Sequence, residues 1–136
     1  MSFKVVGESK KRMYGPRGLL VCGFSKEERT AIKELLAKKT FGQIPVVFST
    51  ESDRQTLVKE MLAKTPDSGQ NQPCFLERAI IMSGVTEQEL HYIMAEYKKT
   101  SLPKPLWASL TPTSEKWTIE ALVAELTSER RQVPHP

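Results

Sequence analysis

The sequence has few of the residues that build metal and redox sites, and it has no long apolar run. Its two cysteines, Cys22 and Cys74, form no CxxC pair, and its two histidines, His91 and His135, lie far apart in the chain. These residues have no metal-ligand spacing, so we expect no metal ion and a reducing compartment. No apolar run approaches the ~20 residues that span a bilayer, so we expect any membrane contact to be peripheral.

The sequence also lacks the glycine-rich loops with which many α/β proteins hold nucleotides. Neither GxGxxG nor GxxxxGK[ST] follows a strand candidate. The turns GFSKEE and SGVTEQ do end at helix starts, where backbone amides can hold an anion. Acidic residues occupy those same first turns and would repel a phosphate: Glu27, Glu28, Glu87 and Glu89. We therefore expect no nucleotide and no other cofactor.

Catalytic side chains do not gather at the predicted strand ends. Acid–base or nucleophilic chemistry needs His, Cys, Asp or Glu to converge there. The polar residues at these turns, Ser25, Ser83 and Thr86, are explained by helix capping, and His91 falls within a helix candidate. The sequence therefore predicts that the protein is not an enzyme.

The positive charge is confined to the start of the chain. The net charge is +4, and residues 1–17 account for all of it with five basic residues against Glu8: Lys4, Lys10, Lys11, Arg12 and Arg17. We expect residues 1–17 to be a flexible basic arm that contacts an acidic protein, anionic lipid or RNA, with Lys10, Lys11, Arg12 and Arg17 as the residues for a membrane or an acidic partner, or else remains a solvated tail. The neutral remainder disfavours nucleic-acid binding. Because the first residues show no secretory or transit signal, an imported protein would be expected in its mature form.

The rest of the chain alternates strand and helix candidates four times. The strand candidates cover residues 18–24, 46–48, 78–84 and 106–110. Capping boxes predict helix starts at Ser25 with Glu28, Ser52 with Gln55, and Thr86 with Glu89, and Thr118 is the expected N-cap of the last helix. Between the second helix and the third strand, the polar residues 65–73 predict a long surface loop that is the best candidate for disorder or for a species-specific insertion.

This alternation predicts an α/β three-layer sandwich. We expect a four-stranded, mostly parallel sheet of order 2-1-3-4 with helices on both faces. The domain should span residues 18–131, followed by a frayed tail at 132–136. In a doubly wound sheet a ligand binds at the switch point, which places a crevice outside the C-terminal ends of strands 1 and 3.

The stretch from Pro105 to Arg130, PLWASLTPTSEKWTIEALVAELTSER, resembles the C-terminal signature of a small domain family with no assigned chemistry. The family occurs in bacteria and plants, and in the green lineage it includes a chloroplast photosystem I assembly factor. Weaker similarity in LLVCGFSKEE and AIIMSGVTEQEL extends the resemblance over roughly residues 18 to 130. It implies a non-catalytic assembly factor in the chloroplast stroma, peripheral on the thylakoid membrane, and it supplies no catalytic residues.

We therefore expect a monomeric protein-binding module whose partner is a photosystem I subunit or another assembly factor. The candidate partner-binding set joins Phe24, Pro112 and Trp117, expected on one strand-tip edge, to Trp107 on the expected edge strand. Core or turn packing also explains these residues. The alternative is a small-ligand-binding or enzymatic domain that uses the crevice at the ends of strands 1 and 3.

Overall fold

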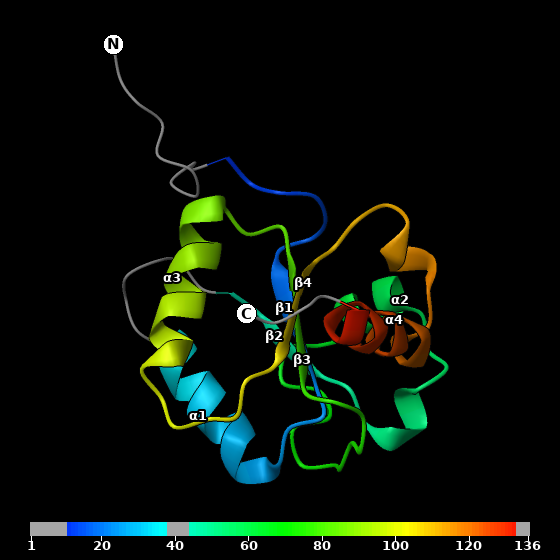
Figure 1. The fold of residues 1–136 in the computed structure, drawn as a ribbon, viewed down its shortest axis with the longest axis horizontal. Coiled ribbons are helices and arrows are strands. Elements are labelled where there is room, and N and C mark those ends of the chain that lie inside the picture. Colours follow the sequence, from blue (N-terminus) through cyan, green and yellow to red (C-terminus); the bar gives the residue numbers. More distant parts are fainter. Residues whose placement is uncertain (1–10, 38–43, 133–136) are drawn as a thin grey trace.

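Four strands form one open sheet in the order β2-β1-β3-β4 (Figure 1). The computed structural model describes residues 11–37 and 44–132. The strands are β1 (Gly18–Cys22), β2 (Val46–Phe48), β3 (Ala79–Ser83) and β4 (Leu106–Ser109). β1 pairs with β2, and β3 with β4, in parallel. The mostly parallel sheet and its strand order are therefore confirmed.

Helices cover both faces of the sheet (Figure 1). On one face lie α1 (Lys26–Leu36) and α3 (Glu87–Lys98), and on the other α2 (Val58–Leu62) and α4 (Ile119–Gln132). Two short 3-10 turns, η1 (Glu51–Asp53) and η2 (Ser114–Lys116), complete the chain. Because strand residues alternate between faces, Leu19 and Val21 enter one apolar core, while Leu20 and Cys22 enter the other.

The direction of β3 differs from the expected one. β3 pairs with β1 antiparallel, with Gly18 opposite Ser83 and Cys22 opposite Ala79. β1 and β2 therefore end where β3 and β4 begin, at what we call the Cys22 end of the sheet. β3 and β4 end at the opposite side, the Ser83 end. The predicted crevice outside the C-terminal ends of strands 1 and 3 is wrong, because those two ends lie at opposite sides of the sheet.

The loop before β3 explains this reversal. The Asp67 N–H donates to the Val46 carbonyl (2.7 Å), and the Phe48 N–H donates to the Ser68 carbonyl (2.9 Å). The loop thus follows the outer edge of β2, and the Glu51 N–H then holds the Pro73 carbonyl (2.9 Å) just beyond that strand. This extra traverse returns the chain to the Cys22 end before β3 starts. Residues 65–75 are therefore anchored along the sheet, contrary to the expected disorder.

Local signals placed most helix starts correctly. Ser25 with Glu28 and Thr86 with Glu89 form the predicted capping boxes, and the Thr118 hydroxyl accepts from the Ala121 N–H (3.1 Å). The box predicted at Ser52 and Gln55 is wrong. Instead, Thr50 and Asp53 form a capping box at the start of η1, and α2 begins after Leu57.

The segment before β1 is part of the domain. The Met13 N–H donates to the Val85 carbonyl (2.8 Å), and the Gly84 N–H donates to the Tyr14 carbonyl (3.0 Å). Arg17 forms an ion pair with Glu89. The prediction of a flexible arm up to residue 17 is therefore wrong for this docked part, since the β3–α3 turn supplies its partners. Lys10 and most of the expected tail lie outside the described residues, and α4 continues to Gln132.

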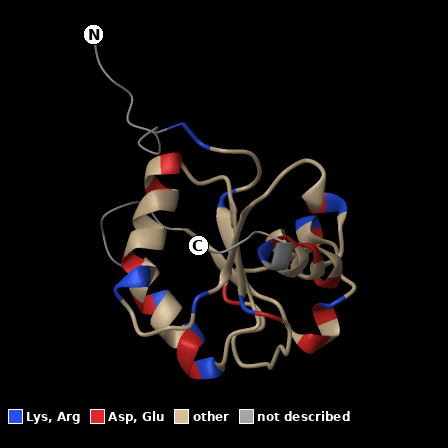
Figure 2. Ribbon diagram, viewed as in Figure 1, with Lys and Arg blue, Asp and Glu red and all other residues tan. Residues whose placement is uncertain are grey.

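Charge is mixed over the helices. Figure 2 shows acidic and basic residues together on α1, whereas α3 carries acids in its first turn and a basic residue in its last. In the ranges 11–37 and 44–132, no helix combines the length and the apolarity that a bilayer crossing requires.

Candidate functional site

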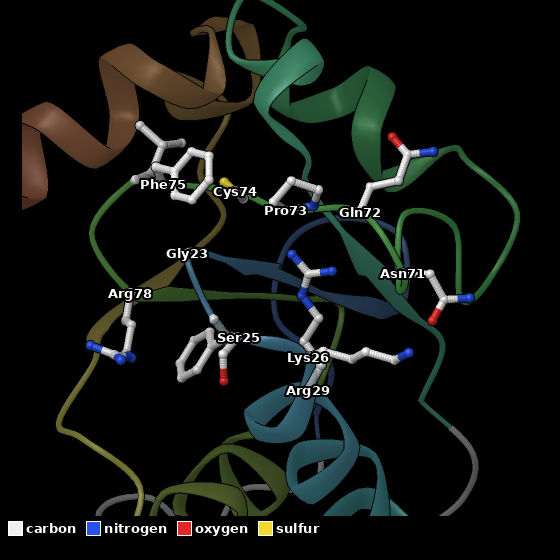
Figure 3. Close-up of a pocket in the computed structure, with 12 residues that line it drawn as sticks. Gly23, Ser25, Lys26, Arg29, Asn71, Gln72, Pro73, Cys74, Phe75 and Arg78 are labelled. Atoms are coloured by element: carbon white, nitrogen blue, oxygen red, sulfur yellow. The ribbon is translucent and has the colours of Figure 1, made fainter.

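A pocket of about 500 Å³ opens at the Cys22 end of the sheet (Figure 3). One wall is the turn from β1 into α1, and the other is the segment from Asn71 to Arg78 that leads into β3. Gly23 makes the close approach of these walls possible. Its φ is +78°, and a Cβ at this position would collide with the carbonyl oxygens of Leu76 and Glu77.

The floor of the pocket holds a buried arginine. Arg29 is 2% exposed, and its guanidinium lies 5.6 Å from the centre of the Phe48 ring. Its Nη1 donates to the carbonyls of Gly69 (2.9 Å) and Gln70 (2.6 Å), which pins the loop to α1. Figure 3 shows the guanidinium pointing from α1 into the pocket. Burial lowers the pKa of Arg29 below its ordinary value.

Arg29 has no carboxylate partner among the described residues. Salt bridges there join other arginines to acids, while Nε and Nη2 of Arg29 have no acceptor in the same part of the chain. Isolated buried charge is costly unless hydrogen bonds and counter-charges compensate it. The two carbonyls and the Phe48 ring supply part of this compensation. The remaining donors, on Nε and Nη2, are available to a ligand.

Of the two acids at this helix start, Glu28 is engaged within the pocket, whereas Glu27 is exposed. Glu28 accepts from Arg78 through Nε to Oε1 and Nη2 to Oε2, both at 3.0 Å. Its Oε1 also accepts from the Ser25 N–H (2.8 Å). Partial burial favours the neutral carboxyl, but the bonds from Arg78 and Ser25 outweigh it and lower the pKa of Glu28. Glu28 therefore neutralises the charge of Arg78 and does not pair with Arg29.

A second cation stands at the mouth of the pocket. Lys26 is exposed and has no ion pair in the part of the chain that the structure describes. Figure 3 shows it extending from α1 toward Asn71. Lys26 and Arg29 are thus two cations without an ion pair among the described residues, and exposed Glu27 is the acid that remains at this helix start. The electrostatics of the pocket suit an anionic group.

An exposed aromatic ring borders the same pocket. Phe75 is 75% exposed, yet its backbone is fixed because its N–H donates to Glu51 Oε1 (2.5 Å). Glu51 is itself held by Arg54 (2.9 Å). The ring therefore projects from an anchored segment, beside a concave cationic surface.

The predicted partner-binding set is not brought together. Phe24 is 2% exposed and packs in the core at the Cys22 end. Pro112 and Trp117 follow β4 at the Ser83 end, where Pro112 is exposed and Trp117 packs against the second core. Trp107 is half-buried edge-on to Tyr97, with ring centres 5.3 Å apart. The single rim predicted for these residues is wrong, because β3 and β4 run opposite to β1.

The predicted basic arm is only partly accessible. Lys11 and Arg12 are exposed, whereas Arg17 is engaged by Glu89. Arg29, Lys26 and Phe75 were missed from the sequence. A signal for Arg29 was present, because it lies three residues before Ile32 on the buried stripe of α1.

Metal-ligating side chains do not cluster in the described part of the chain. No group of three or more His, Cys, Asp or Glu side chains in residues 11–37 and 44–132 is arranged to hold a metal ion. Cys22 and Cys74 are both buried free thiols. Desolvation raises the pKa of Cys22 to about 12, against the opposing effect of a hydrogen bond with Ser49. His91 lies exposed on α3, away from the pocket lining.

Comparison with known proteins shows a similarity that covers the second half of the fold. Residues 78–133 match a family model described as a domain of unknown function (DUF3783). The match includes β3, α3, β4 and α4, and of the residues that line the pocket only Arg78 falls within it. Searches of curated proteins and of solved structures gave no match. Somewhat less than half of the chain is thus similar to this domain of unknown function.

Proposed function

We propose that the protein is a non-catalytic binding module that assists the assembly of a larger protein complex. The observation that carries the proposal is Phe75, a residue that is 75% exposed and whose backbone is held by Glu51. Exposed aromatic anchors beside a pocket are typical of partner-binding surfaces. A fixed backbone also lowers the ordering cost of binding.

The complex we propose is photosystem I, with one of its subunits or another assembly factor as the partner. The resemblance of residues 105–130 supports this choice, and with it a location in the chloroplast stroma, on the stromal face of the thylakoid. The matched domain, residues 78–133, includes this stretch. Its description names no function, so the resemblance is the support for this part of the proposal.

Affinity isolation tests the proposal. The tagged wild-type protein and two variants, Phe75→Ser and Phe75→Tyr, are expressed in a photosynthetic host and the recovered proteins identified by mass spectrometry. Wild type and Phe75→Tyr should recover photosystem I subunits or an assembly factor, while Phe75→Ser should lose about tenfold or more of them, a typical anchor effect. Recovery of ribosomes or RNA in their place, or equal recovery by all three proteins, would contradict it.

A basic N-terminal segment is the proposed peripheral membrane contact. Its candidate residues are Lys10, Lys11 and Arg12, of which Lys11 and Arg12 are exposed, while Arg17 is partly buried in its ion pair with Glu89. Near an anionic membrane each such residue contributes ~1 kcal/mol to the free energy of binding. Deletion of residues 1–12 should weaken flotation with anionic vesicles, and unchanged flotation would rule the segment out as the anchor.

A further inference from the structure

We propose that the pocket at the start of α1 binds a carboxylate carried by an acidic segment of the partner protein, with Arg29 as the principal ligand. This inference rests on the proposed function, since it names the chemistry that the partner presents. It assigns a role to the pocket that neither the resemblance nor the matched family supplies.

The hydrogen bonds of Arg29 leave one edge of its guanidinium for a ligand. Nη1 is used by the Gly69 and Gln70 carbonyls, which fixes the plane of the group. Nε and Nη2 have no acceptor among the described residues, and together they form the side-on edge of the guanidinium. Two parallel N–H donors on this edge match the two oxygens of a carboxylate.

The same pocket shows this geometry with an internal acid. Arg78 uses its Nε and Nη2 to hold both oxygens of Glu28 at 3.0 Å. Arg17 and Arg54 also have carboxylate partners, Glu89 and Glu120. Arg29, at 2% exposure, is more deeply buried than any of these three and has none in the described chain. The geometry therefore points to a carboxylate that comes from outside.

The surroundings favour a peptide over a free small anion. Lys26 provides a second positive charge at the mouth, toward Asn71 (Figure 3). Phe75 on the rim offers apolar surface that a small anion would leave exposed to water. A segment with one acidic residue beside an apolar residue would satisfy both features, with the carboxylate on Arg29 and the apolar side chain on Phe75.

Titration of the wild-type protein tests the carboxylate site directly. Arginine Nε–Hε signals are followed by NMR while sodium acetate is added, with sodium chloride at equal ionic strength as the charge control and phosphate as the anion control. The Arg29 signal should shift saturably, with acetate binding about tenfold more tightly than chloride. The Arg78 signal is the internal control and should stay in place, because Glu28 occupies it. No shift of Arg29, an equal response to chloride, or a response to phosphate alone would overturn the proposal.

Two capped tripeptides test the peptide part. Leu-Glu-Leu should shift both the Arg29 Nε–Hε signal and the Phe75 amide, whereas Leu-Gln-Leu should shift neither. Binding of acetate without binding of Leu-Glu-Leu would overturn the assignment to a protein segment. In Arg29→Lys, which keeps the charge but loses the two-donor edge, binding of both acetate and Leu-Glu-Leu should fall by about tenfold.

The outcomes separate this inference from the proposed function. If partner recovery depends on Phe75 but Arg29→Lys recovers the partner normally and Arg29 ignores acetate, the inference fails and the binding module stands. If acetate and Leu-Glu-Leu bind at Arg29 but no partner is recovered in a Phe75-dependent way, the proposed function fails while the carboxylate chemistry of the pocket remains. The wild-type titration does not depend on any variant folding.

Discussion

Arg17 and Glu89 join the segment before β1 to the first turn of α3 through two parallel hydrogen bonds. Nη1 donates to Oε1 at 2.8 Å and Nη2 to Oε2 at 2.5 Å, and the side chains are 17% and 11% exposed. Glu89 Oε1 also accepts from the Thr86 N–H (2.9 Å) as part of the capping box. The carboxylate of Glu89 therefore takes part in capping α3 and also anchors the N-terminal segment through Arg17.

Removal of this pair should destabilise the domain. Arg17→Met leaves the carboxylate of Glu89 largely buried without its cation, and such losses cost about 1–3 kcal/mol. Urea unfolding followed by circular dichroism measures the change. Arg12→Met is the matched control, because Arg12 is exposed and its loss should cost under ~0.5 kcal/mol. Equal stability of the two variants would show that the Arg17 pair adds nothing.

The same pair should give the stability an acidic pH dependence. The hydrogen bond from Arg17 lowers the pKa of Glu89 below its ordinary value of 4.5. A carboxyl with a lowered folded-state pKa stabilises the fold above its unfolded-state pKa, and this stabilisation is lost as pH falls through the folded-state pKa. The stability difference between wild type and Arg17→Met should therefore shrink as pH falls below 4.5. Urea titrations at several pH values test this, and a difference that grows toward acid would contradict it.

Gly84 should not tolerate a side chain. Its φ is +61°, and a Cβ there would lie 2.5 Å from the Gly15 carbonyl oxygen and 2.7 Å from the Arg17 nitrogen. Gly84→Ala should therefore cost about 2 kcal/mol or more, from backbone strain together with the clash. Gly18→Ala is the control, since its Cβ would meet the Pro45 carbonyl oxygen at 3.4 Å and should change stability by under ~1 kcal/mol. A comparable loss in both variants would count against this explanation.

Cys22 should be inert to alkylation in the native protein. The thiolate is the reactive form, and burial raises the pKa of this fully buried thiol to about 12. Iodoacetamide at pH 8 should therefore modify Cys22 at least about a hundredfold more slowly in buffer than in urea, because reaction needs opening of the core. Mass spectrometry of the peptides measures both rates. Rapid labelling of Cys22 under native conditions would contradict the buried position.

Local sequence patterns predicted most helix starts. They did not predict the direction of β3 or the pocket, because both depend on contacts between residues far apart in the chain. Ser25 with Glu28 marks a helix start because both partners lie within one turn. The reversal of β3 depends on Asp67 pairing with Val46, and no local pattern in a polar loop encodes that contact. The pocket was missed for the same reason, because Arg29 meets Gly69 and Gln70 only after the loop has followed β2. Helix periodicity places Arg29 in line with Ile32, a signal that was not used and that says nothing of what Arg29 binds.

The anchoring of this loop by Arg29 can be tested by hydrogen exchange. In wild type the Asp67 and Phe48 amides should be protected, since they donate to the Val46 and Ser68 carbonyls. Arg29→Met removes two charged hydrogen bonds to the loop, and a loss of about 2 kcal/mol would speed local exchange roughly thirtyfold. The Leu20 amide in the central strand serves as the reference for global unfolding.

Lys33→Met is the matched control for Arg29→Met. It removes the Lys33–Asp67 pair (2.9 Å), in which the side chains are 35% and 52% exposed, and exposed pairs contribute under ~1 kcal/mol. Exchange at Asp67 should therefore change by no more than about fivefold in this variant. If both variants release the loop equally, or if Asp67 is unprotected in wild type, the loop does not depend on Arg29. In that case the fixed guanidinium plane, on which the carboxylate site depends, is lost as well.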